Sequence, residues 1–213
     1  MSEGRTSEGL RSEGFIAEGP VEARVLAPAT RFIFRGGAVA RRAAGAAFGV
    51  ALPETPCRAS AADQRAALWL GPDEHLLLAP AADREADNPA AADPGILAAE
   101  LDAALTGIAH SLVDVSQRHV AMRVSGSRAV ALLNTGCPLD LSDARFPVGM
   151  CTRTLLGKAE VVLWRTDAVE FHLEAMRSFQ DYVLEWLREA GRSEFLLTPE
   201  TPTPSAPARR VQS

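Results

Sequence analysis

The residue types that most often carry catalysis or bind metals are few in this sequence. No two of its histidines are four residues apart, the spacing that puts two ligands on one face of a helix. A metal site made by the closest two would need the intervening turn to bring their side chains together. We therefore expect structural roles for all four, which are His75, His110, His119 and His172. Because His172 alternates with Phe171 and Leu173, we expect it on the solvent or partner face of a strand.

The lysine and the cysteines do not form a reactive cluster. Lys158 is the only residue that could form a Schiff base, and its place after Gly157 is typical of a turn. The cysteines are odd in number and scattered, with no C-x-x-C pair. We expect buried or half-buried free thiols at Cys57, Cys137 and Cys151.

Sequence motifs for nucleotides, phosphates and hydrolysis do not occur. There is no G-x-G, and Gly157-Lys158 lacks the upstream glycine and the following Ser or Thr of a P-loop. There is also no G-x-S-x-G elbow and no H-E-x-x-H. We assign no catalytic, cofactor-binding or metal-binding residue.

Two arginines lie where a guanidinium could grip the carboxylate of a partner. Arg153 enters a predicted strand, and Arg177 precedes Ser178 at the junction of a strand and a helix. A cation is unfavourable at the start of a helix, because the helix dipole is positive there. We predict that Arg153, Arg177 and Ser178 contribute to a partner interface, with an intramolecular salt bridge or a capped carbonyl as the alternative.

Composition and charge are those of an ordinary globular protein. The 213 residues carry a net charge of −5, with a pI of about 5.4. This charge argues against a nucleic-acid partner, which needs a basic face to displace counterions from phosphates. No apolar run approaches the roughly 20 residues that span a bilayer, and the start of the chain does not resemble a secretory signal. We expect a soluble, cytoplasmic protein with no membrane partner.

Low-complexity segments flank the main domain. Ser-Glu-Gly recurs with a period of five residues from Ser2 to Gly14, and apolar side chains are few there. Such a segment cannot bury enough surface to offset its ordering entropy. We predict disordered tails at residues 1–22 and 193–213, the second rich in proline, and an exposed loop from Pro80 to Gly95.

Residues 23–192 form one domain in which the same pattern occurs twice, at about 30–108 and 110–190. Each half has the order strand, helix, strand, strand, helix by hydrophobic periodicity. The segments are 31–34, 38–48, 66–70, 75–79 and 96–108, then 120–124, 128–134, 154–165, 169–175 and 179–189, with a linking strand at 110–115. We predict an α+β fold in which helices pack on mainly antiparallel sheet, as two related ferredoxin-like βαββα halves. Ser178 and Asp181 predict a capping box at the last helix.

Several motifs resemble one known family. Residues 70–74 (LGPDE), followed by an apolar strand, resemble a motif of the aminomethyltransferase superfamily, which includes the glycine-cleavage T protein. Four later segments are similar to the gamma subunit of heterotetrameric sarcosine oxidase, namely 113–116 (VDVS), 136–141 (GCPLDL), 151–161 (CTRTLLGKAEV) and 177–179 (RSF), with Tyr182 and Trp186 beyond. The similarity runs from about Phe32 to Ala190 and leaves out the Ser-Glu-Gly tail.

The resemblance implies a truncated aminomethyltransferase-like fold and a non-catalytic gamma subunit that packs on the alpha subunit, with beta and delta in the same complex. That complex oxidises sarcosine to an imine with a flavin, passes electrons to oxygen, and lets tetrahydrofolate capture the one-carbon unit, which leaves glycine. Flavins, NAD and folate then belong to the alpha and beta subunits and zinc to delta, with no cofactor in this chain. The alternative is a stand-alone folate-binding or one-carbon-transfer protein of the superfamily, so whether this chain is itself an enzyme stays open.

Overall fold

The computed structural model describes residues 21–80 and 93–196. The first half contains β2 (Ala29–Gly36), α1 (Ala38–Phe48), β3 (Ala59–Ala62), β4 (Arg65–Gly71), β5 (Glu74–Pro80), α2 (Pro94–Ala104) and β6 (His110–Asp114). The second contains β7 (His119–Ser125), α3 (Ala129–Asn134), β8 (Cys151–Leu156), β9 (Ala159–Asp167), β10 (Glu170–Met176), the 3₁₀ turn η1 (Arg177–Phe179) and α4 (Gln180–Leu196), and β1 (Glu22–Val25) precedes both.

The two halves have the same strand order. One sheet, here called sheet B, runs β3-β4-β5-β2-β6, and the other, sheet A, runs β8-β9-β10-β7-β1, with every neighbouring pair antiparallel. Each half therefore has the strand order of a ferredoxin-like βαββαβ unit, with one added edge strand. The predicted fold class and its duplication are confirmed. In the second half the final strand is supplied by β1, from the other end of the chain.

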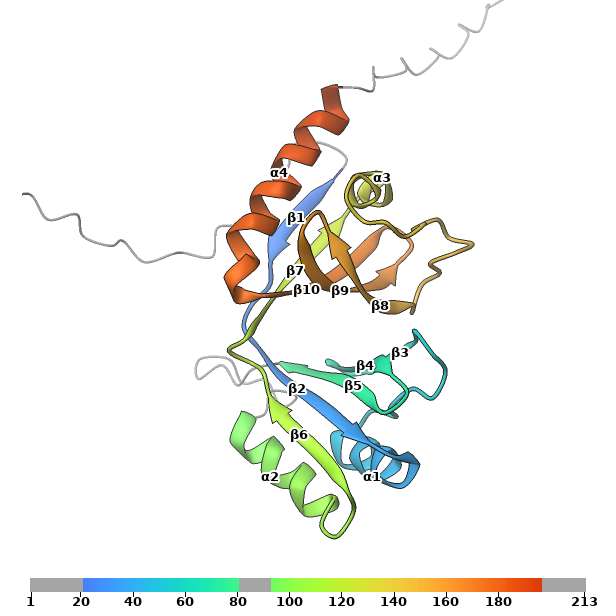
Figure 1. The fold of residues 1–213 in the computed structure, drawn as a ribbon, viewed down its shortest axis with the longest axis vertical. Coiled ribbons are helices and arrows are strands. Elements are labelled where there is room, and N and C mark those ends of the chain that lie inside the picture. Colours follow the sequence, from blue (N-terminus) through green and yellow to red (C-terminus); the bar gives the residue numbers. More distant parts are fainter. Residues whose placement is uncertain (1–20, 81–92, 197–213) are drawn as a thin grey trace, which may run out of the picture.

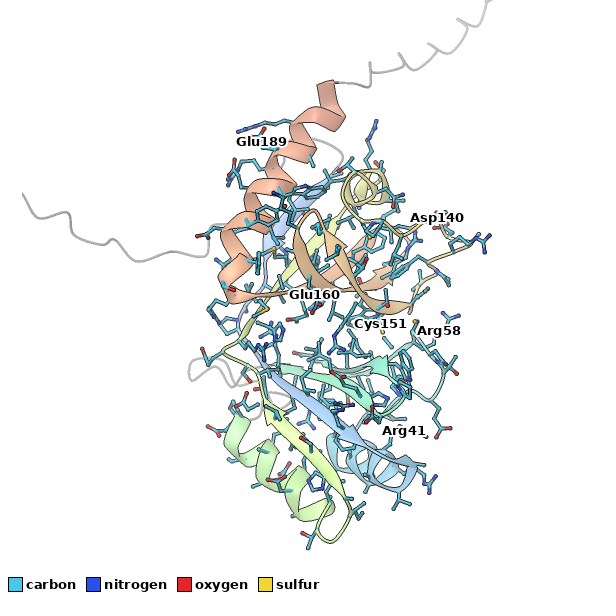
Figure 2. The ribbon with its side chains drawn as sticks, in the orientation of Figure 1. Arg41, Arg58, Asp140, Cys151, Glu160 and Glu189 are labelled. Carbon is cyan, nitrogen blue, oxygen red and sulfur yellow. The ribbon has the colours of Figure 1, made fainter. Side chains whose placement is uncertain are left out.

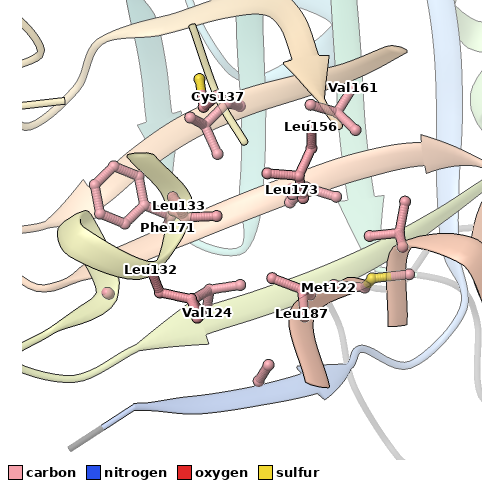
Figure 3. Close-up of a cluster of buried hydrophobic side chains, with 14 of the residues drawn as sticks. Met122, Val124, Leu132, Leu133, Cys137, Leu156, Val161, Phe171, Leu173 and Leu187 are labelled. Carbon is pink, nitrogen blue, oxygen red and sulfur yellow. The ribbon is translucent and has the colours of Figure 1, made fainter. Parts of the chain in front are cut away.

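The elements form four layers, in which the two sheets lie inside and the helices outside (Figure 1). The strands alternate apolar side chains between the two faces of each sheet. Phe171 and Leu173 of β10 join α3 and α4 in one core, whereas Phe32 and Phe34 of β2 join α1 and α2 in another. Figure 3 shows the first core, to which Leu132 and Leu133 of α3 and Leu187 of α4 all belong.

A third cluster lies between the two sheets. Leu68 and Leu76 of sheet B meet Cys151 and Val162 of sheet A. The sheets are joined further by a backbone bridge between Arg58 and Met150. Both faces of each sheet are therefore covered, which explains why β5 is apolar along nearly its whole length.

The structure corrects several boundaries drawn from the sequence. The strand predicted at 154–165 is two strands, β8 and β9, because Gly157 takes a left-handed φ of +59° and turns the chain. The edge strands β1 and β3 were not predicted, since each has four residues, β1 with two charges and β3 rich in alanine, and they carry little hydrophobic signal. Ser178 lies inside η1, whose N-cap is Met176 with no side-chain cap bond, so the predicted capping box is wrong.

The predicted tails and loop lie largely outside the described residues. At their edges, Val21 is buried and α4 continues to Leu196, so structure extends past both expected domain limits. None of the helices in the described ranges is long and apolar enough to cross a membrane.

Candidate functional site

A cleft of about 320 Å³ opens between the two sheets. The apolar part of its wall comes from both sheets and the loop after β6, with Ile33, Leu70, Leu76, Val113, Val115, Val161, Val162 and Met176. Its polar part consists of Arg35, Glu74, Arg118, His119, Arg153, Glu160 and Glu174. Glu160 alternates with core residues of β9 and lies on the side of sheet A that faces sheet B (Figure 2).

The floor of the cleft holds a buried charge network. The Arg31 guanidinium donates from Nε to Glu174 Oε2 at 2.7 Å, and the two side chains are 2% and 0% exposed. His172 Nε2 lies 2.8 Å from the other oxygen, Glu174 Oε1. Burial raises the pKa of Glu174, but hydrogen bonds and charges from His172 and Arg31 outweigh it and leave the pKa below its usual value. Glu174 is therefore ionised in a site almost free of water.

The rim of the cleft carries two further ion pairs. Arg153 of β8 pairs with Glu74 of β5, across the gap between the sheets. Arg35 pairs with Asp73 at 3.0 Å, and this guanidinium lowers the pKa of the Asp73 carboxyl. The Arg153 pair joins the two halves at the mouth of the cleft, whereas the exposed Arg35 pair lies within sheet B and its hairpin.

Arg177 is tied to the loop that leads into β7. Its Nε donates to the carbonyl oxygen of Gln117 at 2.9 Å, and its backbone N–H donates to the carbonyl oxygen of Arg118 at 2.8 Å. The alternative left open by the sequence therefore applies to both arginines. Arg153 forms an intramolecular salt bridge with Glu74, and Arg177 caps the carbonyl of Gln117. Arg153 itself lines the cleft, as do Arg118 and Met176 next to the Arg177 contacts, whereas Arg177 and Ser178 are not part of the cleft wall. Ser178 follows on the exposed η1 turn.

His119 places a neutral imidazole at the cleft. Burial lowers its pKa, with Arg31 and Arg118 acting in the same direction and Glu174 opposing. Its Nδ1 is buried and has no hydrogen-bond partner among the described residues.

The other chemically versatile residues have structural surroundings. Cys137 and Cys151 are buried and Cys57 is half-buried, all as free thiols, which confirms the prediction. Lys158 lies in the β8–β9 turn, where its backbone N–H donates to the Tyr182 hydroxyl at 2.9 Å. The described residues contain no group of three or more His, Cys, Asp or Glu side chains that could hold a metal ion.

His172 does not lie on an outer face, so that prediction is wrong. Its strand has one face on α3 and α4 and the other towards sheet B, and the side chain of His172 is only 16% exposed. The alternation was correctly read, but the sequence did not show that a second sheet covers the polar face.

The charged residues of the cleft floor were missed in the sequence. The signal was an arginine or glutamate inside an apolar strand, as at Arg31 before Phe32 and at Glu174 between Leu173 and Ala175. A charge at such a position is almost never fully buried without a partner. The sequence does not show that Arg31 and Glu174 are partners, because they are 143 positions apart.

Comparison with solved structures first gives the class of protein. A glycine cleavage system aminomethyltransferase T from Bartonella henselae matches 78% of this chain and 45% of its own, with a TM-score of 0.54 at 15% identity. Two facing ferredoxin-like halves thus place this chain in the aminomethyltransferase-like fold class. A chain of the heterotetrameric sarcosine oxidase from Corynebacterium sp. U-96, solved in complex with pyrrole 2-carboxylate, matches more fully, with a TM-score of 0.73, 31% identity, and coverage of 84% and 87%.

Comparison with sequences then gives the family. A model of the sarcosine oxidase, gamma subunit family matches residues 35–193. Sarcosine oxidase subunit gamma of an Arthrobacter species is 34% identical over 175 residues, which are 81% of this chain and 80% of the relative. The subunit gamma of Corynebacterium sp. strain P-1 is 33% identical over 184 residues, 85% and 84% of the two chains. This chain belongs to the sarcosine oxidase gamma subunit family.

Proposed function

We propose that this chain is the non-catalytic subunit that supports assembly of a heterotetrameric sarcosine oxidase, by docking on a folate-binding alpha subunit during oxidative demethylation of sarcosine to glycine. The observation that carries this proposal is the structural match to a chain of a heterotetrameric sarcosine oxidase, which covers 87% of that chain. The gamma family match over residues 35–193 supports the same position in the complex.

The chemistry of the complex is proposed to belong to its other subunits. Flavins, NAD and folate would lie in alpha and beta and zinc in delta, in the cytoplasm. In this chain, by contrast, ion pairs at the inter-sheet cleft join the two sheets. Arg31 with Glu174 and Arg153 with Glu74 are two such pairs. This arrangement suits a rigid body that binds a partner.

The docking surface is proposed to include the edge of sheet A and the predicted residues Arg153, Arg177 and Ser178. β8 ends its sheet, so along most of its length one row of backbone groups has no neighbouring strand among residues 21–80 and 93–196. Leu155 on this strand is 47% exposed, and Phe179 beside Ser178 is 38% exposed. Apolar side chains next to a free edge and to arginines are typical of the core and rim of an interface.

Co-expression tests the proposal directly. We expect this chain to elute with the alpha subunit on a sizing column, and the purified chain alone to be colourless and unable to oxidise sarcosine. A complex prepared without this chain should lose yield or stability while its assembled fraction keeps flavin. Tetrahydrofolate binding by the purified chain, measured by calorimetry, would instead support the stand-alone folate-binding alternative. A chain that stays separate from alpha would contradict the assembly role.

A further inference from the structure

The cleft between the sheets has the dimensions and lining of a small-molecule site. Its volume of about 320 Å³ is within the range of roughly 300–1,000 Å³ that such sites occupy. It lies at the junction of two structural units, where such sites are common, and combines an apolar wall with a few polar groups. The exposed Val113 stands at its opening.

The charges of the cleft are matched except for two. Arg31 neutralises Glu174, Glu74 neutralises Arg153, and Asp73 neutralises Arg35. Arg118 and Glu160 also line the cleft, and neither has a side-chain ion pair with another residue in the described ranges. Among the described residues, the cleft therefore offers one cation, Arg118, and one anion, Glu160, that are not in an ion pair. A ligand with a single charge would pair with only one of these two residues and leave the other without a partner of opposite charge.

Strand register sets the spacing of the backbone at these two residues. His119 pairs with Met176 across β7 and β10, and Ala175 pairs with Val161, so Met176 comes next to Glu160. Arg118 adjoins His119, so its Cα lies about two strand spacings, or about 10 Å, from the Cα of Glu160. Both side chains are long and exposed, so their charged ends can reach opposite ends of one small molecule in the cleft.

From these observations we propose that the cleft binds a zwitterionic amino acid with an apolar side chain. Its carboxylate pairs with Arg118. Its ammonium group pairs with Glu160. Its side chain packs on Val115 and Val162, in the apolar part of the wall. The cleft shares Arg153 with the proposed docking surface, so binding is measured on the chain alone, where the site does not depend on the partner, as well as on the complex.

Calorimetry on the full chain, and on its co-expressed complex, tests the proposal with charge-deleted probes. L-leucine and L-phenylalanine should bind. Four probes each lack one group: N-acetyl-leucine has no ammonium group, leucine amide has no carboxylate, and glycine and sarcosine have no apolar side chain. Each should bind at least about tenfold more weakly than leucine.

Two variants assign the charges to their residues. Arg118→Gln should weaken leucine about tenfold or more and leave leucine amide unaffected, whereas Glu160→Gln should weaken leucine and leave N-acetyl-leucine unaffected. Both residues are exposed, so circular dichroism should show an unchanged fold, and Arg42→Gln on α1 is the matched control without effect. The proposal is overturned if leucine and phenylalanine bind to neither preparation, if binding survives both variants, or if N-acetyl-leucine binds as well as leucine.

Discussion

Arg31 and Glu174 form a buried ion pair that joins the two sheets across the centre of the protein. Arg31 lies on β2 of one half and Glu174 on β10 of the other, and the two side chains are 2% and 0% exposed. Arg31 Nη1 also donates to the carbonyl of Ala29, and its backbone N–H donates to Ser116 Oγ. The pair therefore fixes how one half packs on the other.

Removal of one member of this pair should strongly destabilise the protein. We expect Glu174→Leu to lower the free energy of unfolding by about 3–5 kcal/mol, because it leaves the Arg31 charge buried without a partner. Urea unfolding followed by circular dichroism measures this change. The half-exposed pair of Arg123 and Glu170, at 3.3 Å, provides the control, since Glu170→Leu should cost less than about 1 kcal/mol. Equal costs for the two variants would contradict the role of the buried pair.

The stability of the fold should fall between pH 7.5 and 5.5 because of a buried histidine. Burial lowers the pKa of His75, although the Pro53 carbonyl hydrogen bond opposes this. Below the ordinary pKa of 6.5 the unfolded chain binds a proton that the folded chain does not, so stability decreases as pH falls, by up to about 1.4 kcal/mol per pH unit. His75→Phe should reduce this slope and leave the part that comes from His119, whose pKa burial also lowers, as measured by urea unfolding across that range. Leu77→Val on the same strand should lower stability equally at each pH, and an unchanged slope in His75→Phe would count against the prediction.

The three thiols should differ in their reaction with a disulfide reagent. Burial raises the pKa of Cys151 to about 12, and Cys137 is also buried, whereas Cys57 is half-buried. We expect one fast phase at pH 8, from Cys57, followed by slow phases limited by unfolding. The fast phase should disappear in Cys57→Ser and persist in Cys151→Ser. Fast modification of Cys151 in the folded chain would show that the cluster between the sheets opens readily.

The turn between β8 and β9 requires glycine. Gly157 has a φ of +59°, and a Cβ there would lie 2.5 Å from the Tyr182 hydroxyl and 3.2 Å from the Trp186 ring. Gly157→Ala should therefore lower the free energy of unfolding by about 1–3 kcal/mol. Gly71→Ala is the control, since its Cβ would meet Glu74 at an ordinary 3.5 Å, and we expect a change within about 0.5 kcal/mol. Thermal or urea unfolding of both variants gives the comparison.

A charge on the free sheet edge should weaken docking. In the proposed complex, Leu155→Lys would bury an unpaired ammonium group against the partner. We expect at least tenfold weaker association with alpha, measured by sizing of co-expressed chains and by calorimetry. Val39→Lys places the same charge on α1, at a more exposed apolar residue (59% against 47%), and should not affect association. If Val39→Lys disrupted the complex and Leu155→Lys did not, the docking surface would lie on sheet B and its helices.

The sequence by itself determined most of the local structure. The segment 38–48 was predicted as a helix and is α1, and the repeated order of strands and helices predicted both halves. These features depend on hydrophobic periodicity and on turn residues, which act over a few neighbours along the chain. The family resemblance came from short motifs in the same segments, and the comparisons confirm it.

Only the tertiary structure decided which faces and charges meet. The pairing of Arg31 with Glu174 and the convergence of Arg118 and Glu160 on one cleft join residues from distant strands. β1 completes the second sheet although it precedes the whole first half. Such contacts depend on how two amphipathic sheets pack face to face, and the period of two along a strand carries no information about what covers its polar side.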